Sequence, residues 1–114
     1  MVLLMMAPLT AGCGKKKSTT VVASCNRPGK LCTDYYVEVE AVVRSACTDT
    51  HGGTWADGKA CDRKGAVVGC HSGDSVVWSL RGEGETEASV KEYVGRLCIN
   101  AGEKIVTTDW KPTP

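Results

Sequence analysis

Seven cysteines in a chain of 114 residues constrain the fold more than any other feature of this sequence. One of them, Cys13, stands alone near the start, and the other six form an even set: Cys25, Cys32, Cys47, Cys61, Cys70 and Cys98. None of the spacings is the C-x2-C pattern of zinc sites, redox pairs or haem attachment, so we expect no metal and no cofactor. Six cysteines in an exported chain instead predict a disulfide framework, which forms in an oxidising compartment.

A domain of this size and composition needs covalent staples. The chain has no Phe, three Trp, three Tyr and 13 Gly, so few large side chains are present to fill a core. Small domains bury a small fraction of their surface, and disulfides supply the missing stability. The sequence leaves the connectivity open, but the short loops that they close favour Cys25–Cys32 and Cys47–Cys61, with Cys70–Cys98 as the third bridge.

The lone cysteine follows an apolar segment. Residues 2–9 read VLLMMAPL, which falls far short of the roughly 20 residues of a membrane-spanning helix and is closer to the apolar part of a secretory signal. The next stretch, LTAGC, resembles the lipobox of bacterial lipoproteins: Ala11 and Gly12 fit the pattern, and Thr10 replaces its preferred Leu. The resemblance implies a signal peptide at 1–12 that is cut before Cys13, whose sulfur then carries diacylglycerol and whose amino group is acylated.

Cysteine arithmetic supports this interpretation, because lipidation of Cys13 removes the odd thiol and leaves six for pairing. Segment 13–24 is then a lipidated residue and a flexible tether, with three lysines near the lipid headgroups. Gly14 stands where an Asp would signal inner-membrane retention in such lipoproteins, which implies the outer membrane. Residues 1–12 hold no Lys or Arg, which favours a start codon further upstream. In the alternative interpretation, residues 1–10 are the first element of a cytosolic domain and Cys13 is buried.

The charge of the chain excludes one class of partner. Without the three lysines at 15–17, the 14 basic residues fall to 11 against 13 acidic ones, so the rest of the chain carries about −2. Nucleic-acid-binding domains present a basic face. We therefore expect no nucleic-acid partner.

An internal repeat lies in the predicted disulfide-rich domain, 25–110, which a short tail follows at 111–114. The segments VEAVVRSACTDTHGGTW and VKEYVGRLCINAGEKIV align with one gap, and their apolar positions recur at the i, i+4, i+7 and i+8 spacing of an amphipathic helix. The matched pairs are Val39 and Val90, Val43 and Val94, Ala46 and Leu97, and Cys47 and Cys98. A glycine then ends each helix, at Gly52 or Gly102, and a short β-prone run follows.

A hairpin is expected between the two repeats. In GAVVGCHSGDSVVWSL, two β-branched runs flank a turn at Ser72–Gly73, which places Cys70 opposite Ser75. Val76, Trp78 and Leu80 then share one face, and Gly69, opposite Val76, either leaves room for large neighbours or marks a bulge. The expected fold is α+β: two helices packed on a short antiparallel sheet, stapled by disulfides, with Trp55 and Trp78 in the core. The arrangement resembles small six-cysteine exported proteins of soil Gram-negative bacteria, a resemblance that implies the fold and no activity.

No catalytic residue is expected. His71, Asp74 and Ser75 lie close together in GCHSGDS, but a triad depends on spatial geometry and an oxyanion hole, and polar residues are ordinary beside a turn. The acidic run RGEGETE places Glu83, Glu85 and Glu87 in a Gly-rich loop, where a solvated face and a helix start explain them.

These observations predict a non-enzymatic lipoprotein of the cell envelope. Acylated Cys13 would hold it in the membrane, and the stapled domain would serve as a binding or structural module for an envelope protein or polymer. The alternative is a small disulfide-rich inhibitor or effector that acts on an extracytoplasmic hydrolase, with the loop 51–61 as its wedge. An exposed Trp55 would favour the inhibitor, and a buried Trp55 would favour the module.

Overall fold

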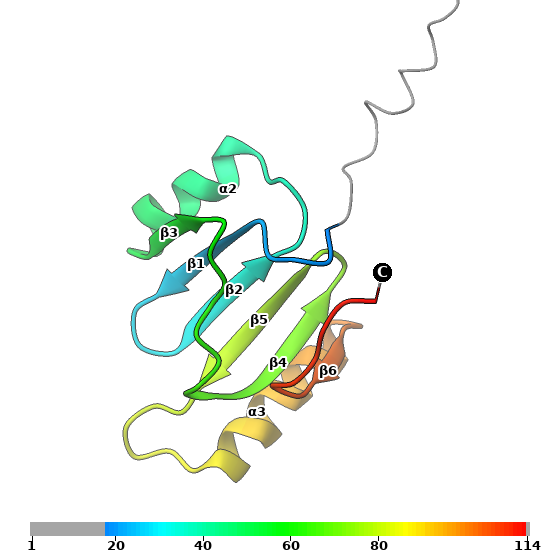
Figure 1. The fold of residues 1–114 in the computed structure, drawn as a ribbon. Helices are drawn as coiled ribbons and strands as arrows, with labels where there is room; N and C mark the ends of the chain where they lie inside the picture. The colour runs from blue at the N-terminus through cyan, green and yellow to red at the C-terminus, as the bar shows by residue number, and fades with distance from the viewer. Residues whose placement is uncertain (1–17, 114) are drawn as a thin grey trace, which may run out of the picture.

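Six antiparallel strands form one sheet in the order β3-β1-β2-β5-β4-β6 (Figure 1). The computed structural model describes residues 18–113, so the expected signal peptide and Cys13 lie outside the described residues. The strands are β1 (Ala23–Arg27), β2 (Leu31–Tyr35), β3 (Thr54–Asp57), β4 (Ala66–Ser72), β5 (Ser75–Leu80) and β6 (Lys104–Val106). The helical segments are α2 (Ala41–Ser45), the π-helical η2 (Ala46–Thr50) and α3 (Glu87–Asn100). The predicted α+β class is confirmed.

The predicted β4–β5 hairpin is present, but its register differs from the expected one. Ser72 pairs with Ser75 across a two-residue turn, and Cys70 pairs with Val77 rather than with Ser75. The difference arises because Gly73 and Asp74 are the two central residues of the turn, whereas the expected turn was centred on Ser72 and Gly73; the φ of 56° at Gly73 suits the first central position of such a turn. The room expected at Gly69 is confirmed, since a Cβ atom there would lie 2.6 Å from the ring of Trp78.

A second hairpin, β1–β2, was not predicted. Its turn contains Pro28 and Gly29, and Gly29 has a φ of 96°, which favours glycine. Before β1, the backbone N–H of Ser18 donates to the carbonyl oxygen of Tyr36 at 2.9 Å, and that of Val22 donates to the carbonyl oxygen of Tyr35 at 2.8 Å. The chain therefore contacts β2 and the residue that follows it before β1 begins at Ala23.

The two halves of the domain share one register from Ala23 and Val68 onward; the register shift between Ala66 and Val68 has no counterpart in the first half. Each half is a hairpin, a helical segment and a strand: β1, β2, α2–η2 and β3 in the first, and β4, β5, α3 and β6 in the second. Cys25 pairs with Thr33 and Trp55 in the first half just as Cys70 pairs with Val77 and Ile105 in the second. The halves meet at the pair Thr33–Val77, so an approximate two-fold axis passes through that pair. The predicted helix-Cys-turn-strand repeat is confirmed, and it extends to the hairpin before it.

Both helical segments cover the same face of the sheet. Residues paired across neighbouring strands point to the same side, so Cys25 and Cys70 share one face. Cys25 is bonded to Cys47 of η2, and Cys70 to Cys98 of α3. We call this side the helical face. The connection 58–65 crosses the opposite side, the loop face, where Cys61 is bonded to Cys32 of β2 (Figure 1).

Two of the three predicted disulfides are wrong, and the sheet explains why. Cys25 lies opposite Thr33, so Cys32, the neighbour of Thr33, points to the other face and is out of its reach. The expected Cys47–Cys61 bridge is wrong for a related reason. Cys47 is bonded to Cys25 on the helical face, whereas Cys61 is bonded to Cys32 on the loop face. Cys70–Cys98 is confirmed, and all six predicted cysteines are paired.

The main core lies on the loop face. Val76 and Trp78 are fully buried there, beside Tyr36, Val106 and the Cys32–Cys61 bridge, and Trp110 packs against them. Trp78 is therefore a core residue, as predicted. Trp55 is only half-buried, with its ring centroid 5.5 Å from that of Tyr35.

The three disulfides place the domain in an oxidising, extracytoplasmic compartment. Among residues 18–113, none of the helices has the length and apolar character needed to span a bilayer.

Candidate functional site

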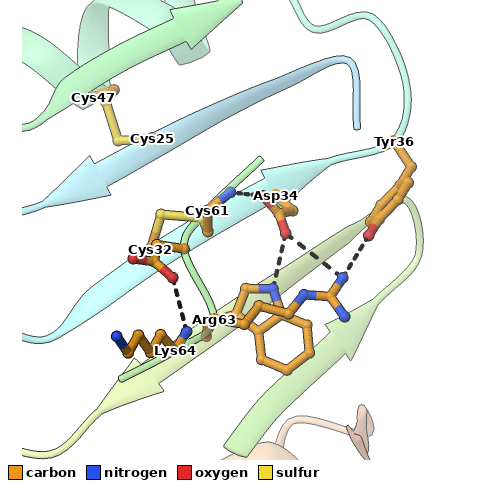
Figure 2. Close-up of a disulfide and its surroundings, with 10 residues drawn as sticks. Cys25, Cys32, Asp34, Tyr36, Cys47, Cys61, Arg63 and Lys64 are labelled. Atoms are coloured by element: carbon orange, nitrogen blue, oxygen red, sulfur yellow. Dashed lines mark hydrogen bonds and ion pairs between the residues drawn. A yellow bond between two sulfur atoms is a disulfide. The ribbon is translucent and has the colours of Figure 1, made fainter. Parts of the chain in front are cut away.

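A buried carboxylate lies at the centre of the loop face. Asp34 is 0% exposed, and its two oxygens accept hydrogen bonds from the backbone N–H of Cys61 at 2.7 Å and from Nε1 of Trp78 at 2.9 Å. Nη2 of Arg63 lies 3.9 Å from Oδ2 of the same carboxylate (Figure 2). The connection 58–65 thus supplies both a backbone donor and a cation to a residue of β2.

Arg63 joins this carboxylate to the rest of the loop face. Its guanidinium lies 4.3 Å from the ring centroid of Trp78, and it donates to the hydroxyl of Tyr36 at 3.1 Å. It also donates to the carbonyl oxygens of Thr108 and Trp110 in the C-terminal segment. Within the described residues, every buried side-chain nitrogen and oxygen has a partner. The cluster is therefore a structural clamp rather than a site that awaits a ligand.

Burial raises the pKa of Asp34 above its ordinary 3.8, against the opposing effects of the Cys61 and Trp78 donors and of Arg63. A carboxyl group with a raised pKa in the folded state contributes stability that is present below the unfolded pKa and is lost as the pH rises through the folded pKa. We therefore expect the difference in melting temperature between the native protein and Asp34→Asn to be larger near pH 3 than near pH 7. Thermal unfolding at several pH values measures it, and a gap that widens with rising pH would contradict the assignment.

Two of the residues weighed as a catalytic group, His71 and Ser75, lie on opposite faces of the sheet. His71 pairs with Val76, so Ser75, the neighbour of Val76, points to the opposite face of the sheet. Nε2 of His71 lies 3.0 Å from the carbonyl oxygen of Gly73, and the hydroxyl of Ser75 donates to the carbonyl oxygen of Ser72. These side chains form no nucleophile–base pair.

One group of potential metal ligands occurs among the described residues, and it consists of Cys70, Cys98 and Glu103. The two sulfurs are bonded to each other, so neither is a thiolate that can bind a metal. The carboxylate of Glu103 alone does not make a metal site.

An open groove lies on the helical face, between α3 and the central strands. Its volume is about 650 Å³. Leu31 of β2 and Val77 of β5 form its floor, and Tyr93 and Leu97 of α3 stand along its edge. Tyr93 is 61% exposed and Leu97 is 53% exposed, although both are large and apolar. The groove is the strongest candidate for a binding site on the described surface.

The sequence of α3 explains why these side chains border the groove. A capping box formed by Thr86 and Ser89 fixes the start of the helix. Val90 and Cys98 then face the sheet and are buried. Tyr93 and Leu97 are spaced i, i+4 and lie one position before Val94 and Cys98, so they form a second apolar stripe beside the buried one.

The internal repeat explains why the second half has a groove of this kind. The register of the sheet makes Ser79 of β5 the counterpart of Tyr35 of β2, because Ser79 pairs with Val68 as Tyr35 pairs with Ala23. In the first half the ring of Tyr35 lies over the helical face, against Trp55. In the second half a serine occupies the same position and leaves that space open.

The two ends of the groove carry charge. At one end, Nζ of Lys30 lies 3.5 Å from Oε2 of Glu85, whose other oxygen accepts a hydrogen bond from the backbone N–H of Gly82. At the other end, Oε1 of Glu103 lies 3.0 Å from Sγ of Cys70, which carries no hydrogen because it is in a disulfide. Within residues 18–113, no Lys, Arg or His nitrogen lies at ion-pair distance from Glu103. Glu85, predicted to be merely solvated, is therefore a half-buried ion-pair partner, whereas Glu103 has no cationic partner in the part of the chain that the structure describes.

The sequence placed Leu97 on the apolar stripe of the second helix, but it did not predict a groove there. Tyr93 and Leu97 look like ordinary helix positions in the sequence. The one signal of an open space was Ser79, because a correct alignment of the two hairpins matches this serine with the aromatic Tyr35. Comparison of the chain with protein-family models, with curated proteins and with solved structures finds no match.

Proposed function

We propose that this protein is a lipid-anchored binding module of the bacterial envelope, held by acylated Cys13, that captures its ligand in the groove beside α3. The observation that carries the binding function is the exposure of Tyr93 and Leu97 over an apolar floor, on a domain held rigid by three disulfides. Rigid scaffolds lower the entropy cost of binding. The anchor rests on the LTAGC motif and on the pairing of the other six cysteines.

The inhibitor hypothesis receives less support. Its wedge, the loop 51–61, contains Trp55, whose Nε1 donates to Asp57 and whose ring contacts Tyr35 and the guanidinium of Arg44. The Cys32–Cys61 bridge also fixes the end of this loop to β2. A side chain engaged on several sides is a poor anchor for insertion into an enzyme cleft.

The anchor is tested by the intact mass of the protein extracted from its membrane. We expect loss of residues 1–12, added acyl mass on Cys13, and six further thiols that react with an alkylating agent only after reduction. Cys13→Ser should abolish the acyl mass, while the three disulfides stay intact. An unacylated chain that keeps residues 1–12 and has free thiols would refute the anchor and the export together.

The binding function is tested by photo-crosslinking in the envelope. A photoreactive phenylalanine analogue replaces Tyr93, and the matched control carries it at Val42, the counterpart of Tyr93 in the repeat, which is 68% exposed but does not border the groove. We expect a discrete crosslinked product at position 93 and none at position 42. Equal products at both positions, or none at 93, would contradict a binding site in the groove.

A further inference from the structure

The helical layer over the sheet is incomplete. Six strands about 4.8 Å apart span roughly 24 Å, whereas one helix with its side chains is about 10 Å wide. η2 packs on β1 and β3, and α3 packs on β4, β6 and, less closely, β5. Neither segment packs mainly on β2, so the groove lies where a third helix would complete the layer.

The groove also presents what an amphipathic helix needs. Leu31 and Val77 offer apolar contacts from below, and Tyr93 and Leu97 offer them from the side. The α3 wall from Ser89 to Leu97 is about 12 Å long, or two to three helical turns. A helix with apolar residues at i, i+4 and i+7 would contact the floor and α3 at once, as in other helix-in-groove complexes.

The charges at the two ends decide what kind of helix fits. Lys30 is already paired with Glu85, so the first end is close to neutral. Glu103 is half-buried, lines the groove and has no cationic partner within residues 18–113. A Lys or Arg of the bound helix would pair with this carboxylate in a partly desolvated place, where an ion pair is stronger than on an open surface.

We infer that the groove receives an amphipathic helix of a partner polypeptide that places a basic side chain against Glu103. This inference rests on the proposed function and identifies the chemistry of its ligand. In the first half of the domain, Tyr35 fills the corresponding space from within; in the second half, Ser79 leaves the space for side chains of the partner.

The test uses two designed, fluorescently labelled helical peptides of about 14 residues with the same leucine pattern, one with Lys and one with Glu at the polar positions. Each is titrated against the intact protein, reconstituted in zwitterionic lipid nanodiscs, with empty nanodiscs as the blank. We expect the Lys peptide to bind about tenfold more tightly than the Glu peptide. Equal affinities would overturn the charge assignment.

Two substitutions locate the binding. Ser79→Tyr introduces the side chain that the first half carries at the same position, and we expect it to weaken the Lys peptide at least about tenfold. Glu103→Gln should weaken the Lys peptide about fivefold and should not weaken the Glu peptide, because the substitution also removes a like-charge repulsion. Val42→Ser, at an exposed apolar site outside the groove, is the control and should change neither affinity. If Ser79→Tyr fails to form its disulfides, Leu97→Ala replaces it with the same expectation.

The outcomes separate this inference from the proposed function. Crosslinking at position 93 together with no peptide preference would keep the binding module and reject the basic helix. An uncharged alkyl maltoside that binds in the groove more tightly than either peptide would point to an acyl chain and also overturn the inference. A crosslink between two copies of this chain would assign the groove to self-association and overturn it as well.

Discussion

Arg63→Met should lower the free energy of unfolding by about 3 kcal/mol, because it leaves the buried carboxylate of Asp34 without its cation. The substitution keeps most of the apolar stem over Trp78, so the effect reports the charge and its hydrogen bonds rather than lost volume. It also removes the donors to Tyr36 and to the C-terminal carbonyl oxygens. For a domain of this size, the melting temperature should fall by roughly 12 °C or more.

The matched control is Arg44→Met. Arg44 also pairs with an aspartate, Asp57, and the distance of 2.7 Å is shorter than the 3.9 Å between Arg63 and Asp34. Both partners are exposed, however, so water and salt screen the pair, and we expect a loss below about 1 kcal/mol. Thermal unfolding followed by tryptophan fluorescence measures both variants. Equal losses would mean that Arg63 contributes as a surface residue and that the clamp is unimportant.

A double substitution separates the charge pair from the other contacts of Arg63. If the clamp works as described, Asp34→Asn should cost less in the Arg63→Met background than in the native protein, because the unpaired charge is then removed. Additive losses would show that the two side chains act independently.

The repeat could be predicted from the sequence because its signals are local. Apolar spacing, a cysteine at the end of each helix and a glycine after it are visible within a few residues, and Thr86 signals the start of α3. The first helix is the weaker one, because α2 buries none of its residues and η2 buries only Cys47. Pro28 and Gly29 between two β-prone runs also carried a local signal, and recognising it would have given the β1–β2 hairpin.

The disulfides could not be predicted, because pairing depends on which face of the sheet each cysteine occupies. Cys25 and Cys32 are close in sequence and lie on adjacent strands, yet a register offset of one residue places them on opposite faces. The groove was beyond the sequence for a related reason. It combines Leu31 with α3 residues far along the chain, and these meet only through the β2–β5 pairing at the two-fold axis.

Removal of the Cys32–Cys61 bridge by a pair of Cys→Ala substitutions should cost about 4 kcal/mol. The bridge spans 29 residues, and the chain-entropy term for a loop of that length is about 3.5 kcal/mol. The rest comes from the core, because both cysteines are buried against Trp78 and the backbone N–H of Cys61 donates to Asp34. A domain of this size has roughly 5–10 kcal/mol in total, so the variant should unfold at low denaturant concentration.

The comparison that decides the mechanism is removal of Cys25–Cys47 by the same substitutions. That bridge spans 22 residues, so its entropy term is within about 0.3 kcal/mol of the other, and both of its cysteines are also buried. Urea unfolding measures the loss of unfolding free energy for each bridge. A larger loss for Cys32–Cys61 would therefore come from contacts of the connection 58–65 and the Asp34 clamp in the folded state, and not from the entropy of the unfolded chain. In that case Arg63→Met should cost little once the Cys32–Cys61 bridge is gone, because both changes release the same segment. Equal losses for the two bridges, with an undiminished Arg63→Met effect, would show that the bridge and the clamp stabilise the loop face independently.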